Sequence, residues 1–490
     1  MSPSLRLLFA LVAVPATSWA TVVEYYDADL DRYFLTADPG EMAYVETGGA
    51  GRVWVRTGYE FETAGPCVAA TTGPCVSRPV CRFYGALPYG SGSHFYTSDE
   101  GECAFVRERD RNWTFEGTPF NVYVVDPATG QCPPNLHPVY RAYNEGYSPA
   151  VNHANHRYSW DPGAQARMVA RGWRNENIVV CATAVRDAPL RSFAMRADAD
   201  RVRSGAACVA DIENLRSCIG FNNIPGPRNV FGPFIAGSSQ SDAFGARTGL
   251  ASGTVYAVEG PAIEGAAANA FVQLAGDRTF GIHVDTRARG ASNLSSINPL
   301  FQFARFAPRV GEADERLTPW AGRYDTEVEV AMSFELRVRR LATQQGSHAY
   351  GHPTLDVFDR RSGVHFYFIV MAFGTVPAVD NVLRDGPDGN VIVATAFRDS
   401  PFGRSFAAAT MDTPSPFASP STQGTGGRYE FRVDRTEFAR ILRAARTLEP
   451  ALSADPADYV FDDYHFNNEI AGDGEIGLTL GSMDLELLRR

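Results

Sequence analysis

The chain of 490 residues carries 56 acidic and 45 basic residues, which gives a net charge of −11. This acidic balance excludes nucleic acid as the expected partner, because phosphates select a basic face, and it disfavours anionic membrane surfaces. Hydrophobic residues make up 44% of the chain, enough for extensive cores, and the length predicts two or three domains. The chain contains no lysine, which excludes Schiff-base lysine chemistry and lysine-containing phosphate loops.

The first twenty residues are typical of a cleavable secretory signal. Arg6 precedes a short apolar run over residues 7–14, and Ser18-Trp19-Ala20 supplies small residues before the expected cut at Thr21. The run is too short to span a bilayer, for which a helix needs roughly 20 residues, and no other stretch has that length and apolarity. We therefore expect a secreted or periplasmic protein with no membrane insertion.

All eight cysteines follow this segment, and an even number in an exported chain predicts four disulfides. Proximity along the chain and the repeats described next favour these pairs: Cys67–Cys75, Cys81–Cys103, Cys132–Cys181 and Cys208–Cys218. A metal role is disfavoured because no CxxC pair or histidine cluster accompanies the cysteines.

One sequence unit occurs three times between residues 22 and 182. Each copy has a Val-Tyr segment, an aromatic segment that ends in aspartate, and a tryptophan that recurs after 59 and 60 residues. Aromatic and β-branched segments predict strands, and the aspartates Asp38, Asp99 and Asp161 predict helix N-caps. Each unit is therefore predicted as strand, strand, short helix and strand, and the three units are predicted to pack around a pseudo-threefold core.

The repeated pattern VYRFYN…HFYT…GWxxEG resembles a family of uncharacterised secreted bacterial repeats, over residues 22–182. Members often accompany secreted hydrolases, so the resemblance implies binding or packing rather than catalysis. The third copy departs from the pattern, with Ala142 in place of an aromatic residue and Arg157 inside the HFYT segment. If the units bind a ligand, we expect the third copy to be inactive.

Residues 183–227 are predicted to be a linker with a small disulfide loop, and residues 228–490 a second, strand-rich domain. Residues 327–339 alternate strictly between apolar and polar side chains, which is typical of a sheet with one solvated face. Asp434 and Glu437 form a capping box before one short helix. The chain is thus predicted to be mainly β, with the repeat module followed by an antiparallel β-sandwich. The segment 466–480 resembles the closing strands of jelly-roll, concanavalin-like domains.

The repeated aromatic residues suit polysaccharide binding, because the C–H faces of sugar rings stack on aromatic rings. The candidate ligand-binding residues recur among the copies: Tyr26, Tyr84, Tyr143, His94, His156, Trp54, Trp113 and Trp173. The alternative is that the tryptophans are core residues with which each copy packs, and that the histidines make strand-end hydrogen bonds.

Two sets of residues in the second domain are candidates for catalysis. Glu327 and Glu329 lie about 7 Å apart by strand rise, a spacing compatible with a glycosidase pair, although the arginines that follow also fit an ordinary solvated face. His365 and Tyr367 share one strand face, with Asp356 nearby in sequence, and a His–Tyr pair can serve as base and acid in a polysaccharide lyase. The alternative for this pair is a buried polar contact.

The oxygen-rich segment near the C-terminus is a candidate calcium site. Asn467, Glu469 and Asp473 offer the oxygen ligands that calcium prefers, in what we expect to be a loop, although the spacing is not that of an EF-hand. The alternative is a set of hairpin turns with exposed acids. No other cofactor is expected.

No GxSxG or HExxH motif is present. The sequence therefore favours a secreted, non-enzymatic binding protein whose partner is a glycan. The first alternative is a secreted polysaccharide-degrading enzyme, either hydrolase or lyase, with its site in the second domain. The second alternative is a structural envelope protein. The sequence indicates no particular oligomeric state.

Overall fold

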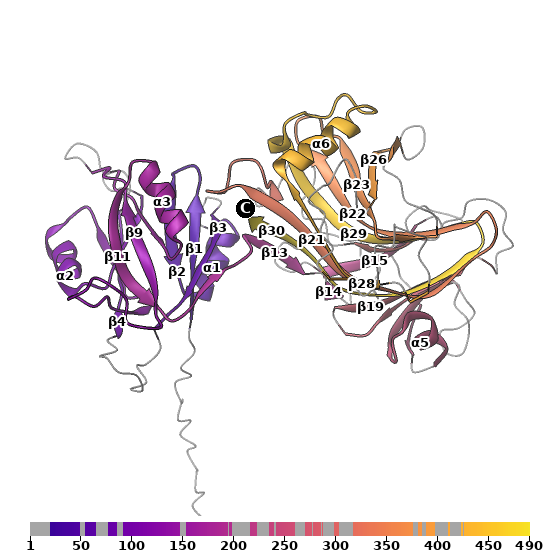
Figure 1. The fold of residues 1–490 in the computed structure, drawn as a ribbon, viewed down its shortest axis with the longest axis horizontal. Helices are drawn as coiled ribbons and strands as arrows, with labels where there is room; N and C mark the ends of the chain where they lie inside the picture. The colour runs from indigo at the N-terminus through magenta and orange to yellow at the C-terminus, as the bar shows by residue number, and fades with distance from the viewer. Residues whose placement is uncertain are drawn as a thin grey trace, which may run out of the picture. The chain divides into compact units, whose positions relative to one another are not determined.

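The structure is a computed structural model. It describes residues 20–49, 54–64, 77–85, 92–147, 153–194, 196–197, 216–222, 235–239, 242–259, 270–276, 278–285, 287, 298–302, 317–375, 381–384, 389–396, 410–411, 423–424 and 426–490. Among these residues, no helix is long and apolar enough to cross a membrane. The chain divides into two compact units, Met1–Ala188 and Pro189–Arg490, called here the first and second units (Figure 1). The predicted signal segment before residue 20 and the cysteines Cys67, Cys75 and Cys208 lie outside the described residues.

The first unit contains the three repeats, and each folds as strand, strand, helix and strand, as predicted. The first comprises β1 (Thr21–Asp27), β2 (Arg32–Thr36), α1 (Pro39–Glu46) and β3 (Val55–Glu62). The second comprises β5 (Cys81–Tyr84), β6 (His94–Thr97), α2 (Glu100–Arg109) and β7 (Thr114–Gly117). The third comprises β9 (His137–Tyr143), β10 (His156–Ser159), α3 (Pro162–Ala170) and β11 (Arg174–Ala182). In each repeat the first strand pairs antiparallel with both others, and β4 (Ser77–Pro79), β8 (Asn121–Tyr123) and β12 (Val185–Asp187) extend the sheets.

The three helices begin where the sequence predicts. Asp38 and Asp99 each accept a hydrogen bond from the backbone N–H three residues later, and Asp161 accepts from the N–H groups two and three residues later. These carboxylates satisfy N–H groups that have no partner inside the helix, which is why the repeated aspartate sets the start of each helix.

A common core receives equivalent residues from all three repeats. Its buried members include Val22 and Val139 of first strands, Val80 directly before the first strand β5, and three residues from the second strands, Leu35, Tyr96 and Tyr158. The Tyr96 hydroxyl donates to the backbone oxygen of Leu35 at 2.8 Å, and the Tyr158 hydroxyl donates to that of Tyr96 at 2.7 Å. The second repeat is therefore hydrogen-bonded to the first and the third to the second, in the pseudo-threefold arrangement predicted from the sequence.

The second unit is built from two mainly antiparallel sheets. The first sheet contains β16 (Ile235–Ser239), β17 (Gly253–Glu259), β18 (Ala270–Leu274), β19 (Thr279–Asp285), β30 (Gly474–Arg489), β21 (Val328–Thr343), β28 (Gly426–Asp434) and β27 (Thr410–Met411), with β13 (Arg191–Ala194) beside β30. The second contains β14 (Arg196–Ala197), β15 (Arg216–Asn222), β20 (Asn298–Gln302), β29 (Tyr459–Ala471), β22 (His348–Asp359), β23 (His365–Met371), β26 (Val391–Ala396) and β25 (Asn381–Arg384), with β24 (Phe373–Gly374) beside β22. The only described parallel pairs are β14–β15 and β23–β26.

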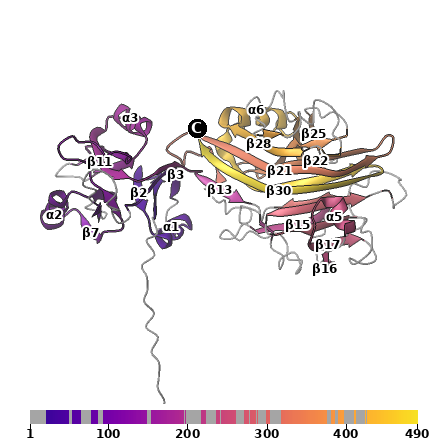
Figure 2. The same ribbon diagram turned by 60° about the horizontal axis from the view of Figure 1, so that its bottom comes forward.

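The two sheets pack through their apolar faces. On β21, the alternating side chains from Val330 to Val338 are at most 2% exposed, and the Phe334 ring lies 5.8 Å from Phe466 of β29. The strand predicted over residues 327–339 is thus confirmed, with its apolar side inward. The long strands β21 and β30 run side by side in Figure 2.

Two turns connect the sheets, and one helix packs against strands of both sheets. The β21–β22 and β29–β30 turns lie together, since the N–H of Gln344 donates to the backbone oxygen of Asp473 at 3.0 Å. The helix α6 (Arg435–Ala445) begins at the predicted cap Asp434 and inserts Phe438 against Trp320 and Tyr459. A second helix, α5 (Asp242–Thr248), was not predicted.

Two expectations about the second half need correction. The described parts of the predicted linker include the strands β12, β13, β14 and β15. Three of them pair with strands remote in sequence, and β14 pairs with β15. The expected calcium loop is also strand: Asn467 and Glu469 belong to β29, and Asp473 stands in the turn that follows it.

Candidate functional site

The repeated aromatic residues of the first unit lie mainly at the boundaries between repeats. The His94 ring packs, tilted, against Tyr84 of its own repeat and Phe34 of the preceding repeat, with ring centroids 5.0 and 4.7 Å apart. The His156 ring stacks on Tyr143 at 4.7 Å and packs, tilted, against Phe95 of the preceding repeat at 4.9 Å. These rings join one repeat to the next.

The repeated tryptophans also face inward. Trp54 and Trp173 are each 8% exposed, and Trp113 is half-buried. Each packs edge-on or tilted against a ring of a second strand, at distances of 5.9 to 6.3 Å: Trp54 on Phe34, Trp113 on Phe95 and Trp173 on Tyr33. None of the eight predicted ligand-binding residues is exposed, with Tyr26 and His156 at 9%. For the tryptophans, the alternative weighed from the sequence, that they are core residues with which each copy packs, agrees with this burial.

Arginine–glutamate pairs cross the same boundaries. Arg82 forms two hydrogen bonds to Glu41 of the first repeat, at 2.9 and 2.8 Å, and Arg141 forms two to Glu102 of the second repeat, at 3.0 and 3.1 Å. Both arginines are only about a tenth exposed. Forked contacts of this kind fix geometry as well as charge.

At the third boundary an arginine–glutamate pair also forms, with the glutamate on the first strand β1 and the arginine on the second strand β10. At the position of Arg82 and Arg141 the first repeat has Glu24, and the third repeat supplies Arg157 to it, at 3.1 Å. Arg157 is 3% exposed and its guanidinium also lies over the Tyr33 ring at 4.5 Å. Arg157, by which the third repeat departs from the pattern, therefore joins the third repeat to the first.

Burial determines the charge of the histidines at these boundaries. Desolvation and, to a lesser extent, the nearby Arg82 lower the pKa of His94 to about 3. Burial likewise lowers the pKa of His156. Both imidazoles are neutral at physiological pH, so each packs as an aromatic ring rather than as a cation.

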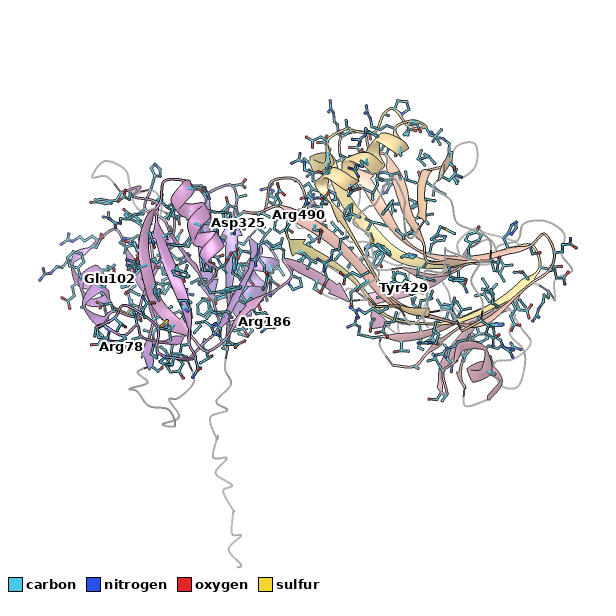
Figure 3. The ribbon with its side chains drawn as sticks, in the orientation of Figure 1. Arg78, Glu102, Arg186, Asp325, Tyr429 and Arg490 are labelled. Atoms are coloured by element: carbon cyan, nitrogen blue, oxygen red, sulfur yellow. A yellow bond between two sulfur atoms is a disulfide. The ribbon has the colours of Figure 1, made fainter. Side chains whose placement is uncertain are left out.

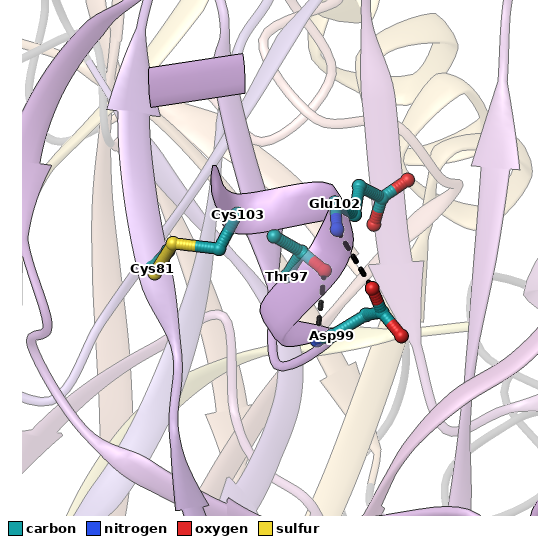
Figure 4. The surroundings of a disulfide bond; sticks show 5 residues. All are labelled: Cys81, Thr97, Asp99, Glu102 and Cys103. Atoms are coloured by element: carbon teal, nitrogen blue, oxygen red, sulfur yellow. Dashed lines mark hydrogen bonds between the residues drawn. A yellow bond between two sulfur atoms is a disulfide. The ribbon is translucent and has the colours of Figure 1, made fainter. Parts of the chain in front are cut away.

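A small surface pocket of about 270 Å³ lies beside α2 in the second repeat. It is lined by the Cys81–Cys103 disulfide, Asp99, Arg78 and Arg107, among others. Figure 4 shows the Asp99 carboxylate turned toward the N–H of Glu102 and the Thr97 hydroxyl accepting from the N–H of Asp99. These polar groups are used to start the helix, so the pocket shows no convergent set of groups for a ligand.

In the second unit, one face of the second sheet carries the predicted Asp356, His365 and Tyr367. His365 Nδ1 lies 3.1 Å from Asp356 Oδ1, and Asn390 Nδ2 donates to the Tyr367 hydroxyl at 3.3 Å. Strand register places Asp356 directly opposite Tyr367. Asp356 is 8% exposed, whereas His365 and Tyr367 are half-buried.

This polar face continues along β22. Residues two apart on a strand share a face, so Tyr350, His352 and Thr354 stand on the same side as Asp356. His352 Nδ1 lies 2.9 Å from the Thr354 hydroxyl, and the rings of Tyr350 and His352 stack at 6.1 Å. The other side of β22 and β23 is apolar and buried, as Leu355, Val357, Phe366 and Phe368 show. We call the side that carries Tyr350, His352, Thr354, Asp356, His365 and Tyr367 the polar face.

The calcium candidates border the same face through β29. Register places Asn467 opposite His352 and Glu469 opposite Tyr350. The backbone N–H of Asp473 donates to the Ser347 hydroxyl at 2.8 Å, so that residue helps to join the two hairpin turns. The backbone of this segment has strand geometry, and it does not form the predicted ligand loop.

Glu327 and Glu329 stand on the first sheet, away from the polar face. Glu329 pairs with Arg432 at 3.1 Å, and Arg432 also pairs with Glu430 at 2.7 Å. Glu327 precedes β21, is exposed, and lines a pocket of about 460 Å³ with Asp325, Asp434 and Arg490, of which Asp325 and Arg490 are labelled in Figure 3. Since Glu329 is held in an ion-pair ladder, the pair matches the ordinary solvated face weighed from the sequence.

Sequence reasoning missed Asn390 and His352. Asn390 reaches Tyr367 because β26 runs parallel to β23, a pairing that no local sequence pattern indicates. His352 lay within a strand with clear alternation, and continuing the period-two pattern from Asp356 back along the strand would have found it.

The comparisons with known proteins follow the division into units. Residues 21–183 match the model of a family described as a domain of unknown function, DUF5648. No curated protein matches the chain. A family 11 xylanase from Neocallimastix patriciarum is similar with a TM-score of 0.24 and 9% identity, over 56% of this chain and 100% of that one. A structure from a comparison of family 12 glycoside hydrolases has a TM-score of 0.25 and 11% identity, over 48% and 92%. Likeness at this level assigns no function.

Proposed function

We propose that the second unit binds a glycan on its polar face. The observation that supports this is the grouping of a carboxylate, an imidazole, a phenol and an amide on three adjacent strands, from Asp356, His365, Tyr367 and Asn390. Sugars present many hydroxyls, each both donor and acceptor, so they are recognised by fixed groups of both kinds together with rings on which C–H faces can stack.

The first unit is proposed as an accessory module of this binding protein. Its aromatic residues are used in packing between repeats, and its two described disulfides fit an oxidising compartment outside the cytoplasm. Mass spectrometry of the protein from its native culture tests the export proposal. A mature chain that begins at Thr21 supports it, and an intact Met1 terminus contradicts it.

A second candidate function rests on the Asp356–His365 hydrogen bond. A carboxylate on one imidazole nitrogen fixes the ring orientation and raises its basicity, and Tyr367 stands two residues from His365. Such a pair can abstract and return protons in a lyase that cleaves polysaccharide. This candidate uses the same residues and predicts new chain ends as well as binding.

The test is incubation of oxidised residues 21–490 with plant, fungal and bacterial polysaccharides, with and without EDTA, scoring retention and new chain ends together. Retention without new ends supports glycan binding, and new ends establish the enzyme. Loss of retention in EDTA assigns a metal to the binding. If neither retention nor new chain ends are observed, the result favours the structural envelope protein and contradicts the glycan proposal.

Single substitutions test whether the glycan binds on the polar face. Tyr367→Phe removes one hydroxyl, and Asn390→Ala removes the amide that donates to it, so each should weaken retention about tenfold or more if these groups contact the glycan. Glu335→Gln is the matched control, because its exposed side chain lies on the other sheet, 3.9 Å from Arg428. Equal retention by all three variants would place binding elsewhere.

A further inference from the structure

Three potential metal ligands meet on the first sheet of the second unit, away from the polar face. His283 and Asp285 alternate along β19, and Glu475 stands directly opposite Asp285 on β30. His283 Nε2 lies 3.1 Å from Glu475 Oε1, and one ligand atom from each residue lies within 4.8 Å of the others. Nearly two hundred residues separate Asp285 from Glu475, so only the strand pairing brings these groups together.

The imidazole is held rigidly while the carboxylates reach solvent. His283 is fully buried and stacks on Phe271 at 4.8 Å, and Phe271 in turn packs against Phe244 of α5 at 4.9 Å. The side chains of Asp285 and Glu475 are 19% and 12% exposed. An ion could therefore reach the carboxylates from solvent and meet an imidazole that is already oriented.

The guanidinium of Arg287 supplies a positive charge between the carboxylates of Asp285 and Glu475. Its guanidinium donates to both oxygens of Asp285, at 3.0 and 2.7 Å, and to Glu475 at 2.8 Å. The arginine side chain is 41% exposed, so it can swing into solvent without opening the core. One cation thus bridges the two carboxylates beside a histidine, and a metal ion would replace it without changing the strands.

We propose that His283, Asp285 and Glu475 form a binding site for a divalent transition-metal ion such as Zn²⁺, in competition with Arg287. The donor set decides the class of ion, because one imidazole nitrogen with two carboxylates suits zinc and its neighbours, whereas calcium requires six to eight oxygens. The bound ion would join β19 to β30. Because this cluster is on the other sheet, the proposal does not depend on glycan binding.

The test uses Co²⁺ as a coloured probe for the full oxidised chain, followed by displacement with Zn²⁺. Replacing Arg287 by glutamine removes the competing charge, so Arg287→Gln should bind Co²⁺ at least tenfold more tightly than the wild type, with visible bands of a low-coordinate site. Zn²⁺ should abolish the bands and raise the melting temperature of this variant.

Two ligand variants and one matched control make the result decisive. Glu475→Gln and His283→Phe, each combined with Arg287→Gln, should lose the bands while the circular dichroism spectrum remains folded. Arg432→Gln is the control, because Arg432 is 43% exposed and bridges the carboxylates of Glu329 and Glu430. Equal affinity of the wild type and Arg287→Gln, or bands that survive Glu475→Gln, would overturn the proposal.

Discussion

Arg157 differs from the residues at its position in the other two repeats, and it joins its own repeat to the first through Glu24. Their side chains are 3% and 1% exposed, and they form the ion pair at the third boundary, whereas Arg82 and Arg141 bind helix glutamates at the other two. A buried charge without its partner is costly, whereas an exposed pair adds little stability. The pair of Arg157 and Glu24 therefore joins the third repeat to the first with a geometry of its own.

Arg157→Ala should lower the free energy of unfolding of the first unit by roughly 3 to 5 kcal/mol, because the buried carboxylate of Glu24 would lose its arginine partner. Urea unfolding followed by tryptophan fluorescence measures this, since Trp54, Trp113, Trp160 and Trp173 all lie in that unit. Arg171→Ala is the control: its pair with Asp31 is 46% and 40% exposed, so the loss should stay below about 1 kcal/mol. Similar losses in both variants would contradict the buried-pair account.

The buried histidine predicts a pH dependence of the same unit. His94 has a pKa of about 3 in the fold and an ordinary value of 6.5 when unfolded, so between these values only the unfolded chain takes up the proton. Stability is therefore complete above pH 6.5 and falls as the pH drops toward 3, by about 1 kcal/mol per pH unit for this group. His94→Gln should flatten the dependence of unfolding free energy on pH between 6.5 and 5. Equal slopes for variant and wild type would refute this assignment.

At the scale of elements, the starts of the helices and the inner faces of the strands were predictable because both depend on nearby residues. Asp99 and Asp434 cap helices with their own side chains, and the alternation around Phe334 fixes which side of β21 is buried. The lengths of β29 and β30 were not predictable in this way. Their ends are set by cross-strand partners, so polar residues such as Asn467 remain in strand geometry.

The two described disulfides each tie a sheet to a neighbouring element, and they should contribute unequally. Cys132–Cys181 spans 49 residues and Cys81–Cys103 spans 22, and closing the longer loop removes more entropy from the unfolded chain. Replacing both members by alanine should cost the first unit about 4 kcal/mol for the former pair and about 3 kcal/mol for the latter. Calorimetry of the two double variants checks the order, and a greater loss from the shorter loop would contradict it.

At the scale of the whole molecule, the sequence predicted the repeat module and the sandwich because both repeat a short pattern many times. It grouped Asp356, His365 and Tyr367 correctly because two of them alternate on one strand and the third lies on the adjacent strand of a hairpin. It could not find Asn390 or the cluster of His283 with Glu475, since these depend on pairing between segments far apart. Of the two readings weighed for the repeated tryptophans, the core reading agrees with their burial.

The most direct test of the central claim is hydrogen–deuterium exchange of the full oxidised chain, with and without the polysaccharide that it retains. The account predicts protection confined to peptides from β22, β23 and the start of β26, around His352, His365 and Asn390. Protection confined to the first unit, or to the pocket beside Glu327, would contradict the claim that the polar face binds the glycan.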